Sequence, residues 1–432
     1  MKKVYNPGKT ELAELLKRPS KNIEDVERTV NQIFGEVSYM GDEAVKKYTS
    51  LFDGAYPDKI KVTPEEIQAA EALVSEELKE AIQLAKSNIE SFHAAQKTEK
   101  VSVETVAGVE CWQEKRPIQK VGLYIPGGSA PLFSTILMLA VPAQIAGCKE
   151  MVLCTPPNKE GKVNPVILYT AKLCGIDTIL KVGGIQAIAG MTFGTESIPK
   201  VYKIFGPGNQ FVTVAKQMAT KYNVSIDMPA GPSELLVVAD DSADAVFVAS
   251  DLLSQAEHGG DSQVILISLS EVFLEKVEAE VQKQLQDLPR KDIAAEAIEN
   301  SRLIFVNDQK EALAIINEYA PEHFIVCTED SDFFVNGIEN AGSVFIGNNT
   351  PESAGDYASG TNHTLPTNGY AKQYSGVNLD SFLKTISFQK ISEEGIQNIG
   401  PAIELMADAE GLKAHKRAVS FRLKALKNSS DE

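Results

Sequence analysis

The sequence has few cysteines, and their arrangement does not point to a cross-linked or thiolate-bound site. Its five cysteines, Cys111, Cys148, Cys154, Cys174 and Cys327, form no CxxC pair. This pattern argues against a disulfide framework and against a zinc site built from thiolates. The three cysteines within apolar runs, at positions 148, 154 and 174, are expected to be small core residues.

Long apolar runs and long basic runs are also missing. No stretch approaches the roughly 20 apolar residues that cross a bilayer, so no membrane partner is expected. The opening, MKKVYNPGKTELAELLKR, has no apolar segment typical of a secretion signal, and the protein is expected to stay in the cytoplasm. The formal charge is −17, from 42 Lys and Arg against 59 Asp and Glu. Because no basic run could follow a phosphate backbone, nucleic acid is not an expected partner.

The composition itself is that of an ordinary globular protein, with 432 residues of which 43% are hydrophobic and 23% charged. This length predicts two or more packed units. Residues 1–120 are expected to form a helical N-terminal segment that packs on the second of two α/β modules. Within this segment, Pro64 follows the N-cap candidate Thr63 and begins a long stretch with helical spacing, and short strand-like runs occur near Val101 and Val109.

Residues 121–232 alternate between apolar strand patterns and helix patterns, and this predicts a first α/β module. Its strands are apolar enough to be covered on both faces, as in a parallel sheet. They run into the turns PGG, VGG, GPGN and AGPSE. These turns should lie together at the carboxyl edge of the sheet, where ligands bind in open α/β folds.

A second α/β module is predicted over residues 233–376, with strands in LLVVAD, VILISLS, LIFVND, HFIVCTE and GSVFIG. After Gly376 the pattern becomes helical, so residues 377–432 are expected to form a helical C-terminal arm. The predicted fold class is therefore α/β, with two tandem Rossmann-like modules that contain parallel sheets. A helical N-terminal segment and a small helical C-terminal domain complete the prediction.

The five histidines differ in their surroundings. His93 lies on an amphipathic helix with nothing polar converging on it, and we interpret it as structural. His258 and Gln255 are three residues apart at a helix end, where they share a face and where the helix dipole favours a cation. A simple helix-capping role for His258 is the alternative. Residue type alone favours Glu257 over Gln255 as a zinc ligand, because carboxylates bind zinc more often than amides do.

Other candidates for chemistry follow. Asp356 and His363 occur in a long polar segment of a kind that is usually functional or disordered. The adjacent Glu322 and His323, at a step from helix to strand, could supply two separate proton acceptors or simply form a solvated helix end. His415 lies on the last helix, where a structural role is the alternative. Taken together, such nitrogen and oxygen donors suit zinc if they converge in space.

Several long motifs, in order along the chain, resemble the histidinol dehydrogenase family. They are VGLYIPGG, PLFSTILMLAVPAQIAG, KVGGIQAIA, IFGPGN, DMPAGPSE, LLSQAEHGGDSQ, APEH, GDYASGTNHTLPT and EGLKAHKRAVSFR. The resemblance extends over essentially the full length. It implies a zinc-dependent oxidation of L-histidinol to L-histidine through the aldehyde, with two NAD reduced, as the last step of histidine biosynthesis. It also implies an intertwined homodimer in which each tail completes the partner's site.

The resemblance further implies a role for each candidate residue. The zinc ligands would be Gln255, His258, Asp356 and His415. The substrate would contact these four ligands together with Ser233, His323, His363 and Glu410. NAD would contact Tyr124, Gln186 and Asn209. The acid/base residues would be Glu322 and His323.

These roles make chemical sense. Hydride transfer from an alcohol requires removal of the hydroxyl proton, which suits His323. The second oxidation requires addition of water to the aldehyde, and Glu322 is the better candidate to activate that water. Zinc would bind the substrate's amine and imidazole nitrogens and orient the carbinol. Because the sequence contains no G-x-G-x-x-G, the prediction of NAD depends on the resemblance.

Three alternatives remain open. The first is a zinc dehydrogenase of the same fold that acts on another amino alcohol or on a sulfonated diol, against which the His363 and Glu410 contacts argue. The second is a metal-stabilised binding protein for a sugar or an amino acid, against which the pair Glu322 and His323 argues. The third is aldehyde oxidation through a cysteine thiohemiacetal, and no cysteine has a neighbouring cation that would activate it.

Overall fold

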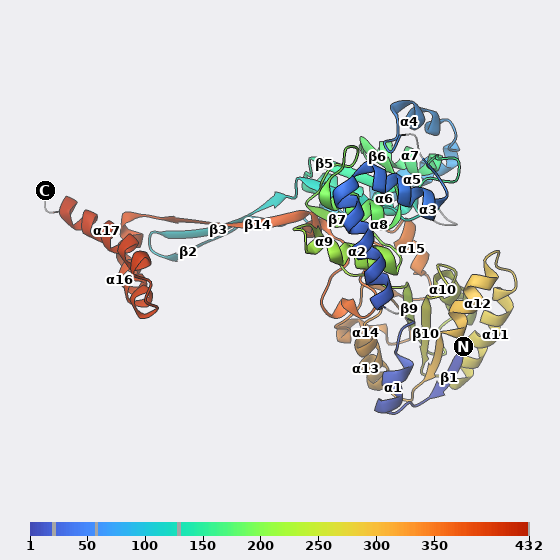
Figure 1. Cartoon of the computed structure of the whole chain (residues 1–432). Helices are drawn as coiled ribbons and strands as arrows, with labels where there is room; N and C mark the ends of the chain where they lie inside the picture. Colours follow the sequence, from blue (N-terminus) through green and yellow to red (C-terminus); the bar gives the residue numbers. More distant parts are fainter. Residues whose placement is uncertain (20–22, 57–58, 128–130, 431–432) are drawn as a thin grey trace. The chain divides into compact units, whose positions relative to one another are not determined.

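The computed structural model describes residues 1–19, 23–56, 59–127 and 131–430, and it shows an α/β protein with two units (Figure 1). Unit 1 comprises residues 1–96 and 118–382, and unit 2 comprises residues 97–117 and 383–432. Unit 1 contains both α/β modules. Gly128, the last residue of the PGG turn, lies outside the described residues.

The first module is a five-stranded parallel sheet with the strand order β6-β5-β4-β7-β8. Its strands are β4 (Lys120–Tyr124), β5 (Glu150–Thr155), β6 (Thr178–Lys181), β7 (Lys203–Phe205) and β8 (Ser225–Ile226). Its helices are α6 (Phe133–Ala146), α7 (Pro165–Leu173), α8 (Gly184–Phe193) and α9 (Gln210–Thr220). Strand and helix alternate as the sequence predicts. The turns after β4, β6, β7 and β8 therefore share the carboxyl edge of the sheet.

The N-terminal segment divides between the modules, whereas the sequence pattern predicted packing on the second module alone. Its helices are α1 (Lys9–Leu15), α2 (Ile23–Met40), α3 (Asp42–Asp53), α4 (Pro64–Glu71) and α5 (Glu76–Ala94). Helix α2 packs against α8 and α9, α4 against α7, and α5 against α6, all in the first module. Strand β1 (Lys2–Tyr5) instead pairs with a strand of the second sheet. A local helical pattern shows that a face is apolar, but not which sheet that face will cover.

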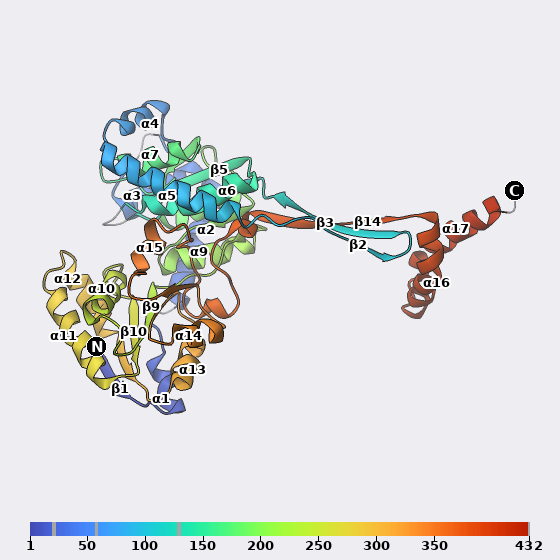
Figure 2. The ribbon, with the colours of Figure 1, turned by 180° about the vertical axis from the view of Figure 1, so that it is seen from behind.

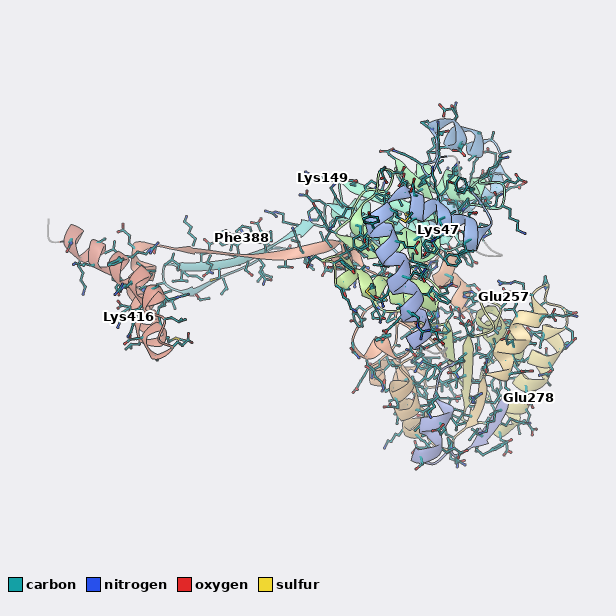
Figure 3. All side chains as sticks on the ribbon, viewed as in Figure 1. Lys47, Lys149, Glu257, Glu278, Phe388 and Lys416 are labelled. Carbon is teal, nitrogen blue, oxygen red and sulfur yellow. The ribbon has the colours of Figure 1, made fainter. Side chains whose placement is uncertain are left out.

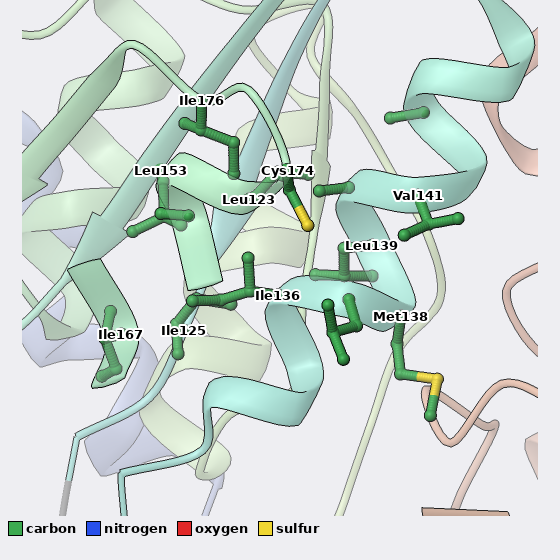
Figure 4. Packing of buried hydrophobic residues seen from close by; sticks show 14 of the residues in the cluster. Leu123, Ile125, Ile136, Met138, Leu139, Val141, Leu153, Ile167, Cys174 and Ile176 are labelled. Carbon is green, nitrogen blue, oxygen red and sulfur yellow. The ribbon is translucent and has the colours of Figure 1, made fainter. Parts of the chain in front are cut away.

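The core of the first module is built around α6, whose sequence FSTILMLAVPAQIA is apolar on all sides. Residues 134–143 are all buried, as expected for a helix that is enclosed on every face. Figure 4 shows part of this cluster, with Leu123 of β4 and Cys174 among the packed side chains. Cys154 is buried as well, and Cys148 is half-buried. Cys154 and Cys174 are core residues, in agreement with the sequence prediction, whereas Cys148 only packs against the edge of the core.

The second module is a six-stranded parallel sheet with the strand order β1-β11-β10-β9-β12-β13. Its further strands are β9 (Glu234–Ala239), β10 (Gln263–Ser268), β11 (Arg302–Phe305), β12 (His323–Cys327) and β13 (Ser343–Ile346). Its helices are α10 (Ala245–Ala256), α11 (Glu271–Leu285), α12 (Lys291–Glu299), α13 (Gln309–Tyr319) and α14 (Ser331–Gly337). The short helix α15 (Glu352–Tyr357) follows and lies where the two modules meet in both views (Figures 1 and 2). The short 3₁₀ helices η1 (Tyr370–Lys372) and η2 (Leu379–Phe382) are the last elements of unit 1 along the chain.

Unit 2 combines a small antiparallel sheet with two helices. The sheet has the order β14-β3-β2, from β2 (Val101–Val106), β3 (Val109–Pro117) and β14 (Leu383–Ile391), and the helices are α16 (Glu393–Ala409) and α17 (Lys413–Ser430). Phe388, labelled in Figure 3, stacks on Trp112 across this sheet with ring centroids 5.2 Å apart. The prediction of a wholly helical arm over 377–432 is thus wrong for β14. The partner of this strand lies far away in the sequence, so the local pattern does not reveal the pairing.

Among the residues that the structure describes, no helix is both long and apolar enough to cross a lipid bilayer.

A buried ion pair fixes the GPGN turn that follows β7. Lys216 Nζ lies 2.5 Å from Asp227 Oδ1, and both side chains are almost fully buried. Lys216 donates to the carbonyl oxygen of Gly206 at 2.7 Å, and Asp227 Oδ2 accepts from the amide of Gly206 at 2.8 Å. Gly206 has a φ of +129°, and a Cβ there would collide with the carbonyl oxygen of Tyr124. The ion pair therefore holds the turn through both the amide and the carbonyl group of Gly206, a position that only glycine can occupy.

Replacing Asp227 by Asn should destabilise unit 1 by about 3 kcal/mol, because Lys216 would stay buried without a counter-charge. The free energy of unfolding measured in urea gives this value. Glu150→Gln serves as the control, since Glu150 pairs with Lys120 on the surface and should leave that free energy nearly unchanged. Equal effects of the two substitutions would contradict the prediction.

Candidate active site

Five of the predicted site residues of unit 1 line a cavity between the carboxyl edge of the first sheet and the amino edge of the second. The cavity has a volume of about 240 Å³ and is lined by the GPGN turn from the first module. Ser233 precedes β9, His258 follows α10, Glu322 precedes β12, and His363 lies in the loop after α15. All four line the same cavity.

His323, the first residue of β12, is held in one orientation by the main chain. Its Nδ1 lies 3.1 Å from the carbonyl oxygen of Glu234, and the ring is buried. Because a carbonyl oxygen can only accept, Nδ1 carries the hydrogen of this bond. Nε2 is buried and has no hydrogen-bond partner among the described residues, and it lies 3.6 Å from Asp356 Oδ1. The nitrogen that faces Asp356 is therefore the one that can exchange a proton with a ligand.

Three carboxyl groups surround the His323 ring. The oxygens of Glu322 and Glu352 lie 3.7 and 3.8 Å from Nδ1. Burial disfavours the charged ring, but these carboxylates and Asp356 raise the pKa of His323 well above its ordinary value. A cation held by Asp356 would offset this effect and lower the pKa of His323 again.

The carboxyl groups themselves divide into two kinds. Burial raises the pKa of Glu322 to about 8, although its Oε2 accepts from the amide of Glu234 at 2.9 Å. Burial also raises the pKa of Glu352. For Asp356 burial works in the same direction, but its contact with His323 and the nearby His363 lower its pKa to about 2. Asp356 is thus the permanent anion of the group, and Glu322 changes its charge near neutral pH.

Glu352 was not singled out in the sequence. It is fully buried, its Oε1 has no hydrogen-bond partner among the described residues, and it forms a compact group of possible metal ligands with His323 and Asp356. The signal in the sequence is its spacing, because Glu352 and Asp356 are four residues apart and share one face of α15. That spacing is informative only once a helix as short as α15 is recognised.

Gln255 and His258 lie together at the end of α10, with Gln255 Nε2 3.2 Å from His258 Nδ1. Gln255 is fully buried, and its Oε1 has no hydrogen-bond partner among the described residues. A buried acceptor of this kind, beside a His258 that interacts electrostatically with Asp356, fits a cation. Glu257, which residue type alone favoured as the ligand, is the half-buried C-cap residue of α10.

His363 is anchored by its neighbours in the neutral form. Nδ1 donates to the carbonyl oxygen of Asp356 at 2.9 Å, and Nε2 lies 3.1 Å from the hydroxyl oxygen of Thr135. Burial lowers its pKa. His93 is buried as predicted for a structural residue, but a polar group does converge on it: the Asn362 amide lies 3.3 Å from its Nε2. His93 therefore supports the loop that carries His363.

A second, larger cavity of about 890 Å³ lies at the carboxyl edge of the first sheet, and both Tyr124 and Asn209 line it. This volume is within the range of cofactor sites. The Tyr124 hydroxyl accepts from the amide of Gly184 at 3.1 Å, and the Asn209 side chain caps α9. Gln186 is fully buried nearby on α8, and both its side-chain polar atoms lack partners among the described residues. The two cavities share Pro126 and Asn209, so they adjoin.

Two predicted residues belong to unit 2. Glu410 is the C-cap residue of α16 and His415 lies in the first turn of α17, and both are exposed. The other predicted residues all belong to unit 1. Unit 1 by itself therefore supplies Gln255, His258 and Asp356, but not the fourth expected ligand.

Comparisons with known proteins agree over nearly the whole chain. A sequence model of the family described as histidinol dehydrogenase matches residues 16–423. A protein of Bacteroides thetaiotaomicron named histidinol dehydrogenase is 60% identical over 427 residues, which cover 99% of this chain and 100% of that protein. A chloroplastic histidinol dehydrogenase of Arabidopsis thaliana is 53% identical over 413 residues, which cover 95% of this chain and 88% of that protein. The crystal structure of histidinol dehydrogenase from Elizabethkingia anophelis matches with a TM-score of 0.96 and 58% identity, covering 99% of both chains.

Proposed function

Because this chain belongs to the histidinol dehydrogenase family, we propose that it oxidises L-histidinol to L-histidine through the aldehyde and reduces two NAD. The observation that carries the proposal is the buried pair Glu322 and His323, which lies beside a small cavity that adjoins a cofactor-sized one. The reaction is the last step of histidine biosynthesis. The described cysteines are free, as is usual for a cytoplasmic protein, and we place the enzyme in that compartment.

The metal that this family binds is zinc, and we assign its ligands to Gln255, His258, Asp356 and His415. Gln255 is supported by its unpartnered Oε1, and Asp356 is supported by its low pKa. When bound, zinc would hold the amine and imidazole nitrogens of the substrate and orient the carbinol. Glu352 is not assigned as a ligand, because burial raises its pKa and so favours the neutral form.

The two bases take different protons. His323 uses Nε2 to remove the hydroxyl proton of the alcohol, because Nδ1 is committed to the carbonyl oxygen of Glu234. Glu322 activates the water that adds to the aldehyde, and it does so as the carboxylate. Ser233, His363 and Glu410 contact the substrate besides the metal ligands. NAD lies against Tyr124, Gln186 and Asn209 in the larger cavity.

The cysteine alternative is disfavoured by burial. Burial raises the thiol pKa of Cys148 and Cys327 to about 12 and raises that of Cys154 and Cys174 as well. The thiolate is the nucleophilic form, so these residues are poorly suited to form a thiohemiacetal. Acid/base catalysis by Glu322 and His323 is favoured instead.

We further propose a homodimer in which His415 and Glu410 come from the partner chain. The support lies in unit 2, where only Val109, Gly395, Gly400 and Ala407 are buried among the described residues. Large apolar side chains on its surface include Val101, Leu405, Met406 and Phe421, which are 62% to 73% exposed. An exposed apolar surface of this kind is typical of an association interface. A two-fold dimer would cover this surface and give each site a tail ligand.

The metal assignment can be tested by chelation. NADH should form from L-histidinol, chelation should abolish this activity, and added zinc should restore it. Neutral imidazole is the form that binds a metal, and burial lowers the pKa of His258 below its ordinary value of about 6.5. Zinc affinity should therefore weaken once the pH falls below that lowered pKa. Full activity in a sample shown to be free of metal would overturn the assignment. Faster turnover of another amino alcohol would favour the alternative dehydrogenase, and no turnover of any alcohol would favour a binding protein.

The two bases should be separable by substitution. His323→Asn should slow the oxidation of the alcohol, whereas Glu322→Gln should chiefly slow the oxidation of added aldehyde, by about 100-fold or more. Burial raises the pKa of Glu322 to about 8, so the carboxylate forms as the pH rises. Aldehyde oxidation by the unmodified enzyme should therefore increase through about pH 8, and Glu322→Gln should lack this increase. Equal losses on both substrates from both variants would contradict the division of roles.

The shared site can be tested with mixed chains. His258→Ala and His415→Ala should each be nearly inactive alone, because every site lacks one ligand. When the two are unfolded and refolded together, half of the dimers are hybrids, and one site of each hybrid has every ligand. Mixing should thus restore about a quarter of the sites. If His415 acts within its own chain, no hybrid site is complete and mixing restores nothing.

A further inference from the structure

Arg18, in the segment after α1, forms a buried ion pair with Glu234 at the start of β9. Its Nε donates to Oε1 at 2.5 Å and its Nη2 donates to Oε2 at 2.9 Å, and the two side chains are only 14% and 1% exposed. Nη2 also donates to the carbonyl oxygen of Tyr319 at 2.6 Å, and the guanidinium lies 4.0 Å from the centre of the Tyr319 ring. One side chain thus joins β9 to the end of α13, which leads into Glu322 and His323.

Glu234 is the residue whose main chain holds both bases. Its amide donates to Glu322 Oε2 at 2.9 Å, and its carbonyl oxygen accepts from His323 Nδ1 at 3.1 Å. Its side chain is fixed on the other side as well, because Oε1 accepts from the amide of Asn368 at 2.6 Å. The carboxylate of Glu234 therefore anchors the one peptide segment that orients Glu322 and His323.

We propose that Arg18 is a positioning residue for both bases and acts through Glu234. The inference rests on the proposed function for the identity of the bases. Without the guanidinium, Glu234 would be a buried carboxylate with no counter-charge, and the start of β9 would shift to relieve it. A displacement of about 1 Å at a reacting group can lower a rate about 100-fold. Because one residue orients both bases, both oxidation steps should depend on Arg18.

A purely structural ion pair makes a different prediction, since it would lower stability but leave the turnover of folded molecules unchanged. Lys181→Met provides the matched control. Lys181 Nζ lies 2.5 Å from Glu66 Oε1 in the first module, with side chains 10% and 32% exposed. This variant should lose stability and keep its kcat.

The kinetic test compares Arg18→Met, Arg18→Lys and Lys181→Met, all loaded with zinc and assayed below the onset of thermal unfolding. Arg18→Met should lower kcat about 100-fold both for the alcohol and for the added aldehyde. The KM for each of these substrates should stay within about twofold of that of the unmodified enzyme. Arg18→Lys keeps the charge but not the bidentate contact, so its kcat should fall about 10-fold. This variant still tests the proposal if Arg18→Met does not fold. Wild-type kcat in a folded Arg18 variant, or a change in KM alone, would overturn the proposal.

A second readout does not depend on activity. The chain has only five histidines, so ring nitrogen NMR spectra of the ¹⁵N-histidine-labelled enzyme can be assigned with His323→Asn. The His323 Nδ1–H signal should shift or broaden in Arg18→Lys, whereas that of His93, which is bonded to the carbonyl oxygen of Ile89 at 2.9 Å, should not move. An unchanged His323 signal would refute the proposal. If the wild-type chain makes no NADH from L-histidinol, the proposed function fails, and the spectra still report on positioning by Arg18.

Discussion

The burial of several carboxyl groups around one imidazole is the constraint on which this structure depends. Glu322, Glu352 and Asp356 all lie within 4 Å of the His323 ring. Such groups cannot all be ionised away from water unless each has a partner. The chain meets this requirement in different ways: Glu322 accepts from a main-chain amide, Asp356 lies beside the imidazole, and burial raises the pKa of Glu352, which disfavours its charged form. A bound cation fits the same arrangement, since it adds positive charge where the protein alone has too little.

The two α/β modules contribute unlike parts of the site. The first supplies turns at a carboxyl edge, where main-chain groups and the cap of α9 line the larger cavity. The second supplies titratable side chains at its amino edge. There β9 pairs with β12, His323 lies opposite Leu235, and the carbonyl oxygen of the preceding residue, Glu234, accepts from the imidazole. The strands fix the spacing of the bases, and the turns leave room for ligands. The paired strands of the second module thus position the catalytic side chains, and the turns of the first module form the binding cavity.

Much of the fold could be predicted from the sequence because the βαβ pattern is local. Each strand and helix of the first module is marked by its own apolar spacing, and the Gly-rich turns mark the sheet edge. The pairing of β14 with β3 could not be predicted in this way, because it joins residues 383–391 to residues 109–117. The same holds for the division of the N-terminal helices between modules, which depends on packing rather than on local pattern.

The candidate site shows a similar limit. The motifs placed Glu322, His323 and Asp356 as candidates, but residue type favoured Glu257 over Gln255, and only the helix geometry shows that Gln255 is the buried one. Glu352 was missed because its helix is short. Arg18 was missed because nothing nearby in the sequence identifies Glu234 as its partner. Side chains that act through a distant partner are visible only once the chain is folded.

The long-range pairings also set an order of assembly during synthesis. Strands β4 to β8 lie between residues 120 and 226, so the first sheet has all its strands early. The second sheet must wait for β13, and β3 must wait for β14 near the end of the chain. Pairings between such distant segments form slowly, and the waiting strand edges are prone to aggregation. During synthesis, β3 therefore has an unpaired edge for most of the time that the chain takes to emerge.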